Sequence, residues 1–441
     1  MPRRLLYLLL CSHSLLFAEI DPSAVLLEIR RHVAANISRL PNYLCTETVD
    51  RQTLEPEMFI RGHSSCEQII ASVEKAPRNF RLASSDRLRL DVALNSRSEM
   101  YSWVGEGRFD DRELSEIVKQ GTTSTGTFGS FLHAIFVSPG PAFTFKGESQ
   151  LADRAVLEYD FEVPITRSGY VVSNQTTSRL TGYSGTFTVD AKTLELLRLQ
   201  IRTDPLAPEL HICRSTTNLD YAKVQMNNVE VLLPSEVDVR MLTSDGRLSH
   251  NRIVFRGCHQ FTGESKLIFE DQPAETGTSA AAGIKAKAFT LSDGLKVSVA
   301  LTQSVDPATA AAGDPVSGKL TRPIKDLATG LIIPKGVKVN GRIFGLLSYH
   351  LGLGGLEFGV KWESFEMDGV NHPLDLLVKS AGPGSANLPP IHGHWPEIGA
   401  AIRPEQRGVG FFYFPSVGRN YQIPSGFESE WVTVAVATES K

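Results

Sequence analysis

GTFTVDAKTLELLRLQIRT, at residues 185–203, is the stretch that decides the fold class. Its first half alternates threonine with the apolar Phe187 and Val189, so one face of a strand is apolar and the other polar. The next four residues, from Asp190 to Thr193, favour a tight turn, because an aspartate side chain can bond the backbone two residues further on. A second apolar row then returns with strand periodicity: Leu194, Leu196 or Leu197, Leu199 and Ile201. The stretch therefore predicts an antiparallel β-hairpin.

The chain on both sides of this hairpin continues the same pattern. Short alternating segments separated by turn residues follow one another from 142 to 269, and a second β-rich region begins near 289. We expect a mainly β protein: an N-terminal antiparallel meander or half-barrel with a few packed helices, then a smaller C-terminal β-sandwich or barrel-like domain. The predicted boundaries are a signal peptide at 1–18, a first domain at 19–270, a small polar linker at 271–288 and a second domain at 289–441.

Two apolar segments predict helices that pack on the first sheet. Residues 22–40 begin with the helix-start pair Asp21-Pro22, and residues 128–137 follow a loop rich in glycine, serine and threonine. Backbone amides in such a loop can cradle an anion, but we favour simple capping of a buried helix. His133, among apolar neighbours, is interpreted as a packed core residue and not as a catalyst.

Composition and the N-terminus indicate an exported globular protein. The 441 residues carry a formal net charge of −4, which predicts no nucleic-acid partner. MPRRLLYLLLCSHSLLFA, residues 1–18, has the two arginines and apolar run of a signal peptide cleaved near Ala18. Lipidation at Cys11 is the weaker alternative, since Leu10 precedes it. No later stretch reaches the roughly 18 apolar residues of a membrane helix, so we expect a periplasmic or outer-membrane-associated protein without a transmembrane helix.

Four cysteines remain outside the leader: Cys45, Cys66, Cys213 and Cys258. An even number in an exported chain predicts two disulfides, with three possible connectivities. We choose the sequence-local pairs, Cys45–Cys66 and Cys213–Cys258. The spacings lack the CxxC pairs typical of a structural zinc site.

Signals of catalysis are weak. No nucleophile-elbow motif occurs, and no motif assembles a base, a nucleophile and oxyanion donors. His392 and His394, with Glu397 close behind, are the best metal candidates, but they lie in a loop rich in proline and glycine. We therefore predict no catalytic residues, no metal and no cofactor, and favour a non-enzymatic protein.

With these motifs in view, residues about 20–270 resemble the half-barrels of the periplasmic lipoprotein-carrier (LolA-like) superfamily and a group of uncharacterised secreted bacterial β proteins. The likeness rests on the helix at 22–40, the meander and the 185–203 hairpin, whose first strand ends in Asp before a Thr-containing turn. Members of that superfamily bind acyl chains on a concave apolar face, so the resemblance implies a lipid or lipoprotein partner there. The contact residues would be Phe131, Phe136, Phe187, Val189, Leu196 and Leu199. Residues 313–344, with GDPVSGKL and IPKGVKVNGRI, faintly resemble the outer-membrane β domains of type IV secretion scaffolds.

Three hypotheses follow. The leading one is an exported, non-enzymatic envelope protein that binds an apolar ligand or lipidated partner on a concave β-sheet. The alternative is a structural or protein-interaction module of the envelope without a small-molecule ligand. An interior filled by the helices at 22–40 and 128–137 would favour this alternative. A hydrolase is the third, and it would need His133, His392 or His394 beside a serine or a carboxylate.

Overall fold

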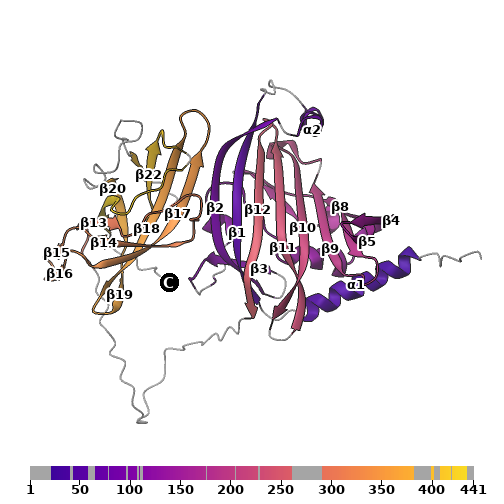
Figure 1. Cartoon of the computed structure of the whole chain (residues 1–441), viewed down its shortest axis with the longest axis horizontal. Helices are drawn as coiled ribbons and strands as arrows, with labels where there is room; N and C mark the ends of the chain where they lie inside the picture. The colour runs from indigo at the N-terminus through magenta and orange to yellow at the C-terminus, as the bar shows by residue number, and fades with distance from the viewer. Residues whose placement is uncertain are drawn as a thin grey trace, which may run out of the picture.

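A computed structural model describes residues 21–39, 43–57, 65–77, 79–95, 98–106, 109, 113–174, 176–203, 205–226, 229–260, 291–381, 399–401, 408–418 and 420–434. Two large hydrophobic cores divide these residues into an N-terminal unit (residues 21–260) and a C-terminal unit (residues 291–434). Both units consist mainly of antiparallel strands, as the sequence predicts (Figure 1). The leader and the linker proposed at 271–288 lie outside the described residues.

The N-terminal unit is one long antiparallel sheet that curves around its core. Its strand order is β3 (Ser98–Trp103), β2 (Phe80–Asn95), β1 (Tyr43–Pro56), β12 (Leu248–Gln260), β11 (Val229–Thr243), β10 (Ile212–Met226), β9 (Leu196–Thr203), β8 (Tyr183–Asp190), β5 (Arg154–Val163) and β4 (Ala142–Leu151). A separate hairpin joins β6 (Val171–Ser173) to β7 (Ser178–Leu180). The first strand of the chain therefore lies inside the sheet, between β2 and β12.

The helices of this unit lie on the sheet or at its ends. They are α1 (Pro22–Arg39), α2 (Cys66–Lys75), α3 (Leu114–Ile117), α4 (Ser130–Leu132), the π-helix η1 (His133–Val137) and two 3-10 turns, η2 (Ile165–Arg167) and η3 (Pro208–Leu210). The helix predicted at 22–40 is confirmed, and Asp21 caps it by accepting the backbone N–H of Ser23 at 2.9 Å. The helix predicted at 128–137 begins later, at Ser130, and continues as a π-helix from His133.

The predicted hairpin is β8 and β9. The Asp190 carboxylate accepts the backbone N–H groups of Lys192 at 2.9 Å and Thr193 at 3.0 Å, and these hydrogen bonds hold the pKa of Asp190 below its usual value. Phe187 lies opposite Leu199, and both are fully buried. The pairing register shifts at the doubled apolar position 196–197. Thr188 pairs with Arg198 and Val189 pairs with Leu196, so Leu197 is an extra residue on β9.

The disulfide pairing predicted from the sequence is wrong. Cys45 is bonded to Cys258, and Cys66 to Cys213. The physical reason is strand order: β1 and β12 are neighbours, which brings the α-carbons of Cys45 and Cys258 to 4.1 Å. Cys66 opens α2, which packs on the start of β10, where Cys213 lies. Proximity along the chain was therefore a poor guide to proximity in space.

The C-terminal unit is a strongly curved, barrel-like sheet. Its strand order is β20 (Leu376–Ala381), β23 (Glu428–Thr433), β13 (Lys296–Leu301), β14 (Pro315–Leu320), β17 (Lys338–Tyr349), β18 (Gly355–Met367), β22 (Gly410–Pro415) and β21 (Gly399–Ala401), with β19 (Val370–Pro373) beside the far end of β18. A small hairpin pairs β15 (Ile324–Asp326) with β16 (Leu331–Ile333). Buried aromatic rings fill its interior, including those of Phe412, Phe427 and Trp431.

The two units are joined along the outer edge of β2. β3 covers this edge only from Leu90 to Asn95. The C-terminal unit covers a further part: Ala312 forms a parallel bridge with Leu88, and the end of β17 pairs with Ser84 and Ser85. One continuous sheet therefore runs from the first unit into the second (Figure 1).

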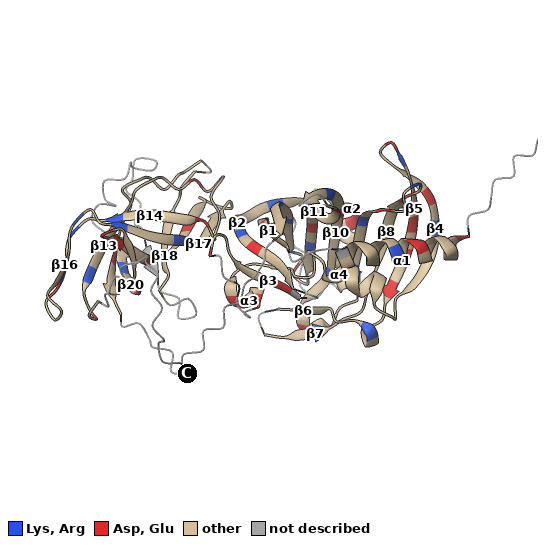
Figure 2. Ribbon diagram, turned by 90° about the horizontal axis from the view of Figure 1, so that it is seen from below, with Lys and Arg blue, Asp and Glu red and all other residues tan. Residues whose placement is uncertain are grey.

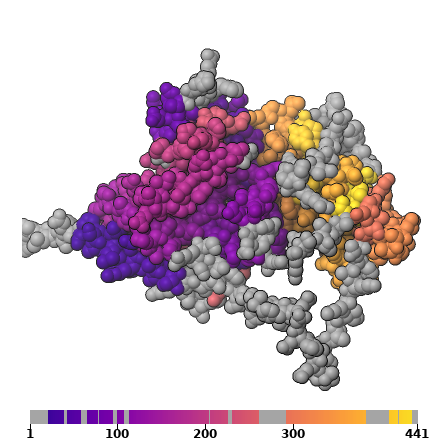
Figure 3. All heavy atoms as spheres, turned by 180° about the vertical axis from the view of Figure 1, so that it is seen from behind, coloured from indigo at the N-terminus to yellow at the C-terminus, as the bar shows by residue number. Residues whose placement is uncertain are grey.

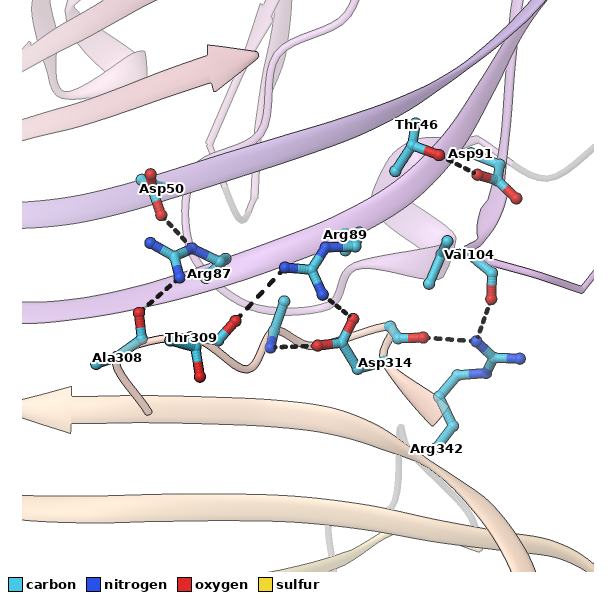
Figure 4. Close-up of polar contacts among 12 residues, drawn as sticks. Thr46, Asp50, Arg87, Arg89, Asp91, Val104, Ala308, Thr309, Asp314 and Arg342 are labelled. Atoms are coloured by element: carbon cyan, nitrogen blue, oxygen red, sulfur yellow. Dashed lines mark hydrogen bonds and ion pairs between the residues drawn. The ribbon is translucent and has the colours of Figure 1, made fainter. Parts of the chain in front are cut away.

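Charged side chains fix the same joint (Figure 4). Arg89 forms an ion pair with Asp314 across it, and Arg87 donates to a backbone carbonyl of the C-terminal unit at 2.7 Å. In the opposite direction, the buried Arg342 donates to a backbone carbonyl of the N-terminal unit at 2.8 Å. Figure 3 shows the two units in contact along this seam, purple against orange. The units are thus held in a defined orientation by backbone and side-chain bonds together.

Candidate functional site

The structure brings the six residues predicted to contact a ligand into one core. All are at most 5% exposed: Phe131, Phe136, Phe187, Val189, Leu196 and Leu199. The Phe136 ring meets Phe187 edge-on with 5.0 Å between centroids, and Tyr159 stacks on the other side of Phe187 at 5.2 Å. The inner row of the sheet is therefore covered by side chains from the segment 130–137. Whether it takes a ligand stays a prediction.

The cover of this inner face consists of α1 and the α4–η1 segment (Figure 2). Of α1, only Ile29 and Val33 are fully buried, and Leu27 is half exposed. Asn36 exchanges two hydrogen bonds of 3.0 Å with the backbone of Leu232 on β11. Arg30 also donates to the backbone carbonyl of Phe136 at 2.9 Å, and the Tyr159 hydroxyl donates to the carbonyl of Pro22 at 3.0 Å. Further α1 side chains pack on the core while partly exposed: Val25, Leu26 and Ile37.

The loop before α4 cradles an anion that belongs to the chain itself. The backbone N–H groups of Gly126, Phe128 and Gly129 donate to the carboxylate of Glu99 at 2.7, 2.8 and 3.0 Å. The Tyr101 hydroxyl donates to the same carboxylate at 2.7 Å. The amide cradle set aside in favour of simple capping therefore exists, with Glu99 of β3 as its anion.

A second carboxyl group, Glu47 on β1, is buried near Glu99. Glu47 is 1% exposed, and among the described residues its Oε2 atom has no hydrogen-bond partner. Burial, and then the negative charge of Glu99, raise the pKa of Glu47 to about 8. The side chain is therefore mainly neutral at pH 7, which makes it a donor as well as an acceptor.

Three buried tyrosines surround these carboxyl groups. Burial raises the pKa of Tyr43, Tyr101 and Tyr221, and the charge of Glu99 raises each of them further. Sequence reasoning missed this cluster because no motif connects its members. A signal was present: Glu47 shares the inward parity of Tyr43 and Cys45 on an alternating strand, where an apolar residue is expected.

The histidines proposed for a hydrolase receive little support. The Nδ1 atom of the half-buried His133 lies 3.4 Å from the Ser138 hydroxyl, a long contact for a base and its nucleophile. His392, His394 and Glu397 lie outside the described residues. Within the described part of the chain, no three His, Cys, Asp or Glu side chains form a metal-binding group. In the same residues, no helix has the length and apolar character needed to span a membrane.

Comparisons with known proteins add three similar solved structures. No family model and no curated protein matches the chain. A DUF1329 family protein from Desulfovibrio piger ATCC 29098 is 10% identical, over 56% of this chain and 96% of that chain, with a TM-score of 0.27. A putative outer membrane lipoprotein-sorting protein domain from Vibrio parahaemolyticus is 11% identical, over 53% and 90%, with a TM-score of 0.26. A LolA superfamily protein from Nitrosomonas europaea is 9% identical, over 55% and 95%, with a TM-score of 0.24. The third of these proteins is a member of the superfamily that residues about 20–270 resemble in sequence pattern.

Proposed function

We propose that the chain is an exported, non-enzymatic envelope protein that binds an apolar ligand, or the acyl chain of a lipidated partner, on the inner face of its N-terminal sheet. The observation that carries the proposal is which elements cover the inner face of this sheet. A continuous apolar row lies under one helix with two fully buried side chains and one short segment, α4–η1. The two disulfides fit an exported protein.

The free energy gained by burying the side chains of α1 can be compared with the free energy gained by burying an acyl chain in their place. The two fully buried side chains of α1, Ile29 and Val33, contribute about 1.5–3 kcal/mol each. An acyl chain of a dozen methylenes that replaces them gains about 0.8 kcal/mol per methylene, or roughly 10 kcal/mol. Displacement of α1 would also cost the packing of Val25, Leu26 and Ile37 and the hydrogen bonds of the helix, so the two sums are of similar size.

The first test is uptake of a fluorescent apolar probe, N-phenyl-1-naphthylamine, by the purified full chain. Asn36→Ala removes both hydrogen bonds between α1 and Leu232, each worth about 0.5–1.5 kcal/mol. We expect probe uptake by the wild type and several-fold faster uptake by this variant. Leu27→Gln changes a half-exposed position on the same helix and serves as the control, with uptake unchanged. Absence of uptake by all three proteins would refute the proposal, as would native mass spectra without any bound lipid.

The second candidate is a structural or protein-interaction module of the envelope. One observation favours it: the inner row is filled by the chain's own side chains, Phe131 and Phe136 among them. It predicts no probe uptake even by Asn36→Ala, and its function would then lie on the outer surfaces of the two joined units.

We also propose that residues 19–270 and 289–441 are separate folding domains, which the two hydrophobic cores support. The joint through β2 then holds two domains that each have a core of their own. The unfolding experiment that opens the Discussion tests this division.

A further inference from the structure

Acidic side chains form a cluster in the interior of the N-terminal unit. Glu47 and Glu99 lie together with Tyr43, Tyr101 and Tyr221, and all three tyrosines are buried. Every neighbouring charge that shifts the pKa of Glu47 or of a tyrosine here is acidic. Burial of a carboxyl group that has an oxygen without a hydrogen-bond partner is unfavourable, so packing alone does not explain Glu47.

The two carboxyl groups differ in how well they are bonded. Glu99 accepts from three backbone N–H groups within 3.0 Å and from Tyr101, so its charge is well compensated. Glu47 has a buried oxygen without a partner in the described residues, and so does Thr127, whose Oγ1 atom lies in the loop that binds Glu99. A buried polar atom without a hydrogen-bond partner destabilises the folded state. Glu47 is therefore poised to receive a donor from outside.

One segment covers both Glu47 and the apolar row. Phe128 belongs to the Glu99 cradle, and its ring packs on Tyr43 at 4.7 Å and on Phe255, opposite Glu47, at 5.0 Å. The same segment continues into Phe136, which lies on Phe187. Residues 126–137 thus contact both the surroundings of Glu47 and the row of Phe187.

We infer that Glu47 receives the cationic head of an amphipathic ligand, a primary amine on an alkyl or acyl chain, and that the chain extends under residues 126–137 toward the row of Phe187. This inference rests on the proposed function and names its ligand class. On binding, the ammonium group keeps its proton and the neutral Glu47 carboxyl loses one to solvent, so one proton is released for each ligand bound. Glu99 adds a second negative charge nearby and disfavours anionic heads. A neutral alcohol gains no ion pair.

The test is isothermal titration calorimetry of the full chain with decylamine, decanol and decanoate. Titrations at pH 7 in phosphate and in Tris, which differ in ionisation enthalpy, count the protons released. We expect decylamine to bind at least about ten-fold more tightly than decanol, as one charge-assisted hydrogen bond of about 1.5–3 kcal/mol requires. We expect about one proton to be released for each amine bound.

Two matched variants test whether Glu47 is the group that binds the amine. Glu47→Gln keeps the shape of the side chain, and we expect it to abolish proton release and the preference for the amine while decanol binding is unchanged. Glu148→Gln makes the same chemical change at an exposed position on β4 and should alter nothing. Equal binding of amine and alcohol, proton release by Glu47→Gln, or preference for decanoate would overturn the inference and leave the proposed function standing. Binding of none of the three probes to the wild type would overturn both.

Discussion

Gly313 is the residue at which the joint between the two units is most sensitive to a single methyl group. Its φ of +105° is one that side-chain-bearing residues rarely adopt, and an added Cβ atom would lie 2.0 Å from the carbonyl oxygen of Arg89 and 3.0 Å from the Trp103 ring. Neither β2 nor a buried indole can withdraw by that distance. Gly313→Ala therefore forces residues 308–314 away from β2.

The expected loss has three parts. The left-handed backbone costs about 1–2 kcal/mol, and the two backbone hydrogen bonds between Ala312 and β2, at 2.7 and 2.8 Å, contribute about 0.5–1.5 kcal/mol each. The partly buried ion pair of Arg89 with Asp314 is lost as well. Together these predict that the free energy of unfolding falls by roughly 3–5 kcal/mol.

The matched control is Gly336→Ala. Gly336 has a φ of +91°, but nothing lies within 4 Å of the Cβ atom it would gain, so this variant carries only the backbone cost. Urea denaturation followed by tryptophan fluorescence compares the two variants. We expect Gly313→Ala to lose about 2 kcal/mol more than the control. If the two units are separate domains, its unfolding should divide into two transitions. Equal losses for both variants would contradict the steric reasoning, and a single cooperative transition would count against the domain division.

Two further predictions concern the buried Glu47 and the partly buried Glu99. The pKa of Glu47 rises from an ordinary 4.5 to about 8 in the folded state. Between these two pH values the folded protein keeps the proton on Glu47, whereas the unfolded chain loses it. Its contribution to stability is complete below pH 4.5 and declines by about 1.4 kcal/mol per pH unit until pH 8. Glu47→Gln should remove this decline and stabilise the protein at pH 8; urea denaturation at pH 5, 7 and 9 measures the slope, and an unchanged slope would refute the assignment. Glu99→Gln places an amide against the cradle of backbone N–H groups and should cost about 2–4 kcal/mol at pH 7; a loss below about 0.5 kcal/mol in the same assay would show that the cradle contributes little.

The parts of the fold that depend on local chemistry were predictable from the sequence. The alternation around Phe187 and the bonding capacity of Asp190 predict the hairpin, and the Asp21-Pro22 start predicts α1, because each signal lies within a few residues. The inward direction of Phe187 and Leu199 was predictable for the same reason, since they are an adjacent pair on one hairpin.

The remainder depends on which distant segments meet, and no local pattern carries that information. Glu99 and its cradle at Gly126 lie on separate elements, so the amides could be recognised but not the anion they bind. The edge of β2 accepts Ala312 from the other unit, a contact that only the full strand order reveals. The unsatisfied Glu47 was visible as an acidic residue at an inward position, although its burial required the fold.

The position of β1 between β2 and β12 also has a consequence for the order of events during synthesis. β2 follows β1 closely, but β12 is the last strand of its unit, so one edge of β1 stays unpaired until almost the whole unit has been made. During that interval Cys45 encounters Cys66 well before its native partner Cys258 arrives. The native pair therefore requires that Cys45 stays reduced or that an early bond to Cys66 is exchanged. Alkylation of free thiols during oxidative refolding distinguishes the two routes, and a compartment with disulfide-isomerising activity suits the second.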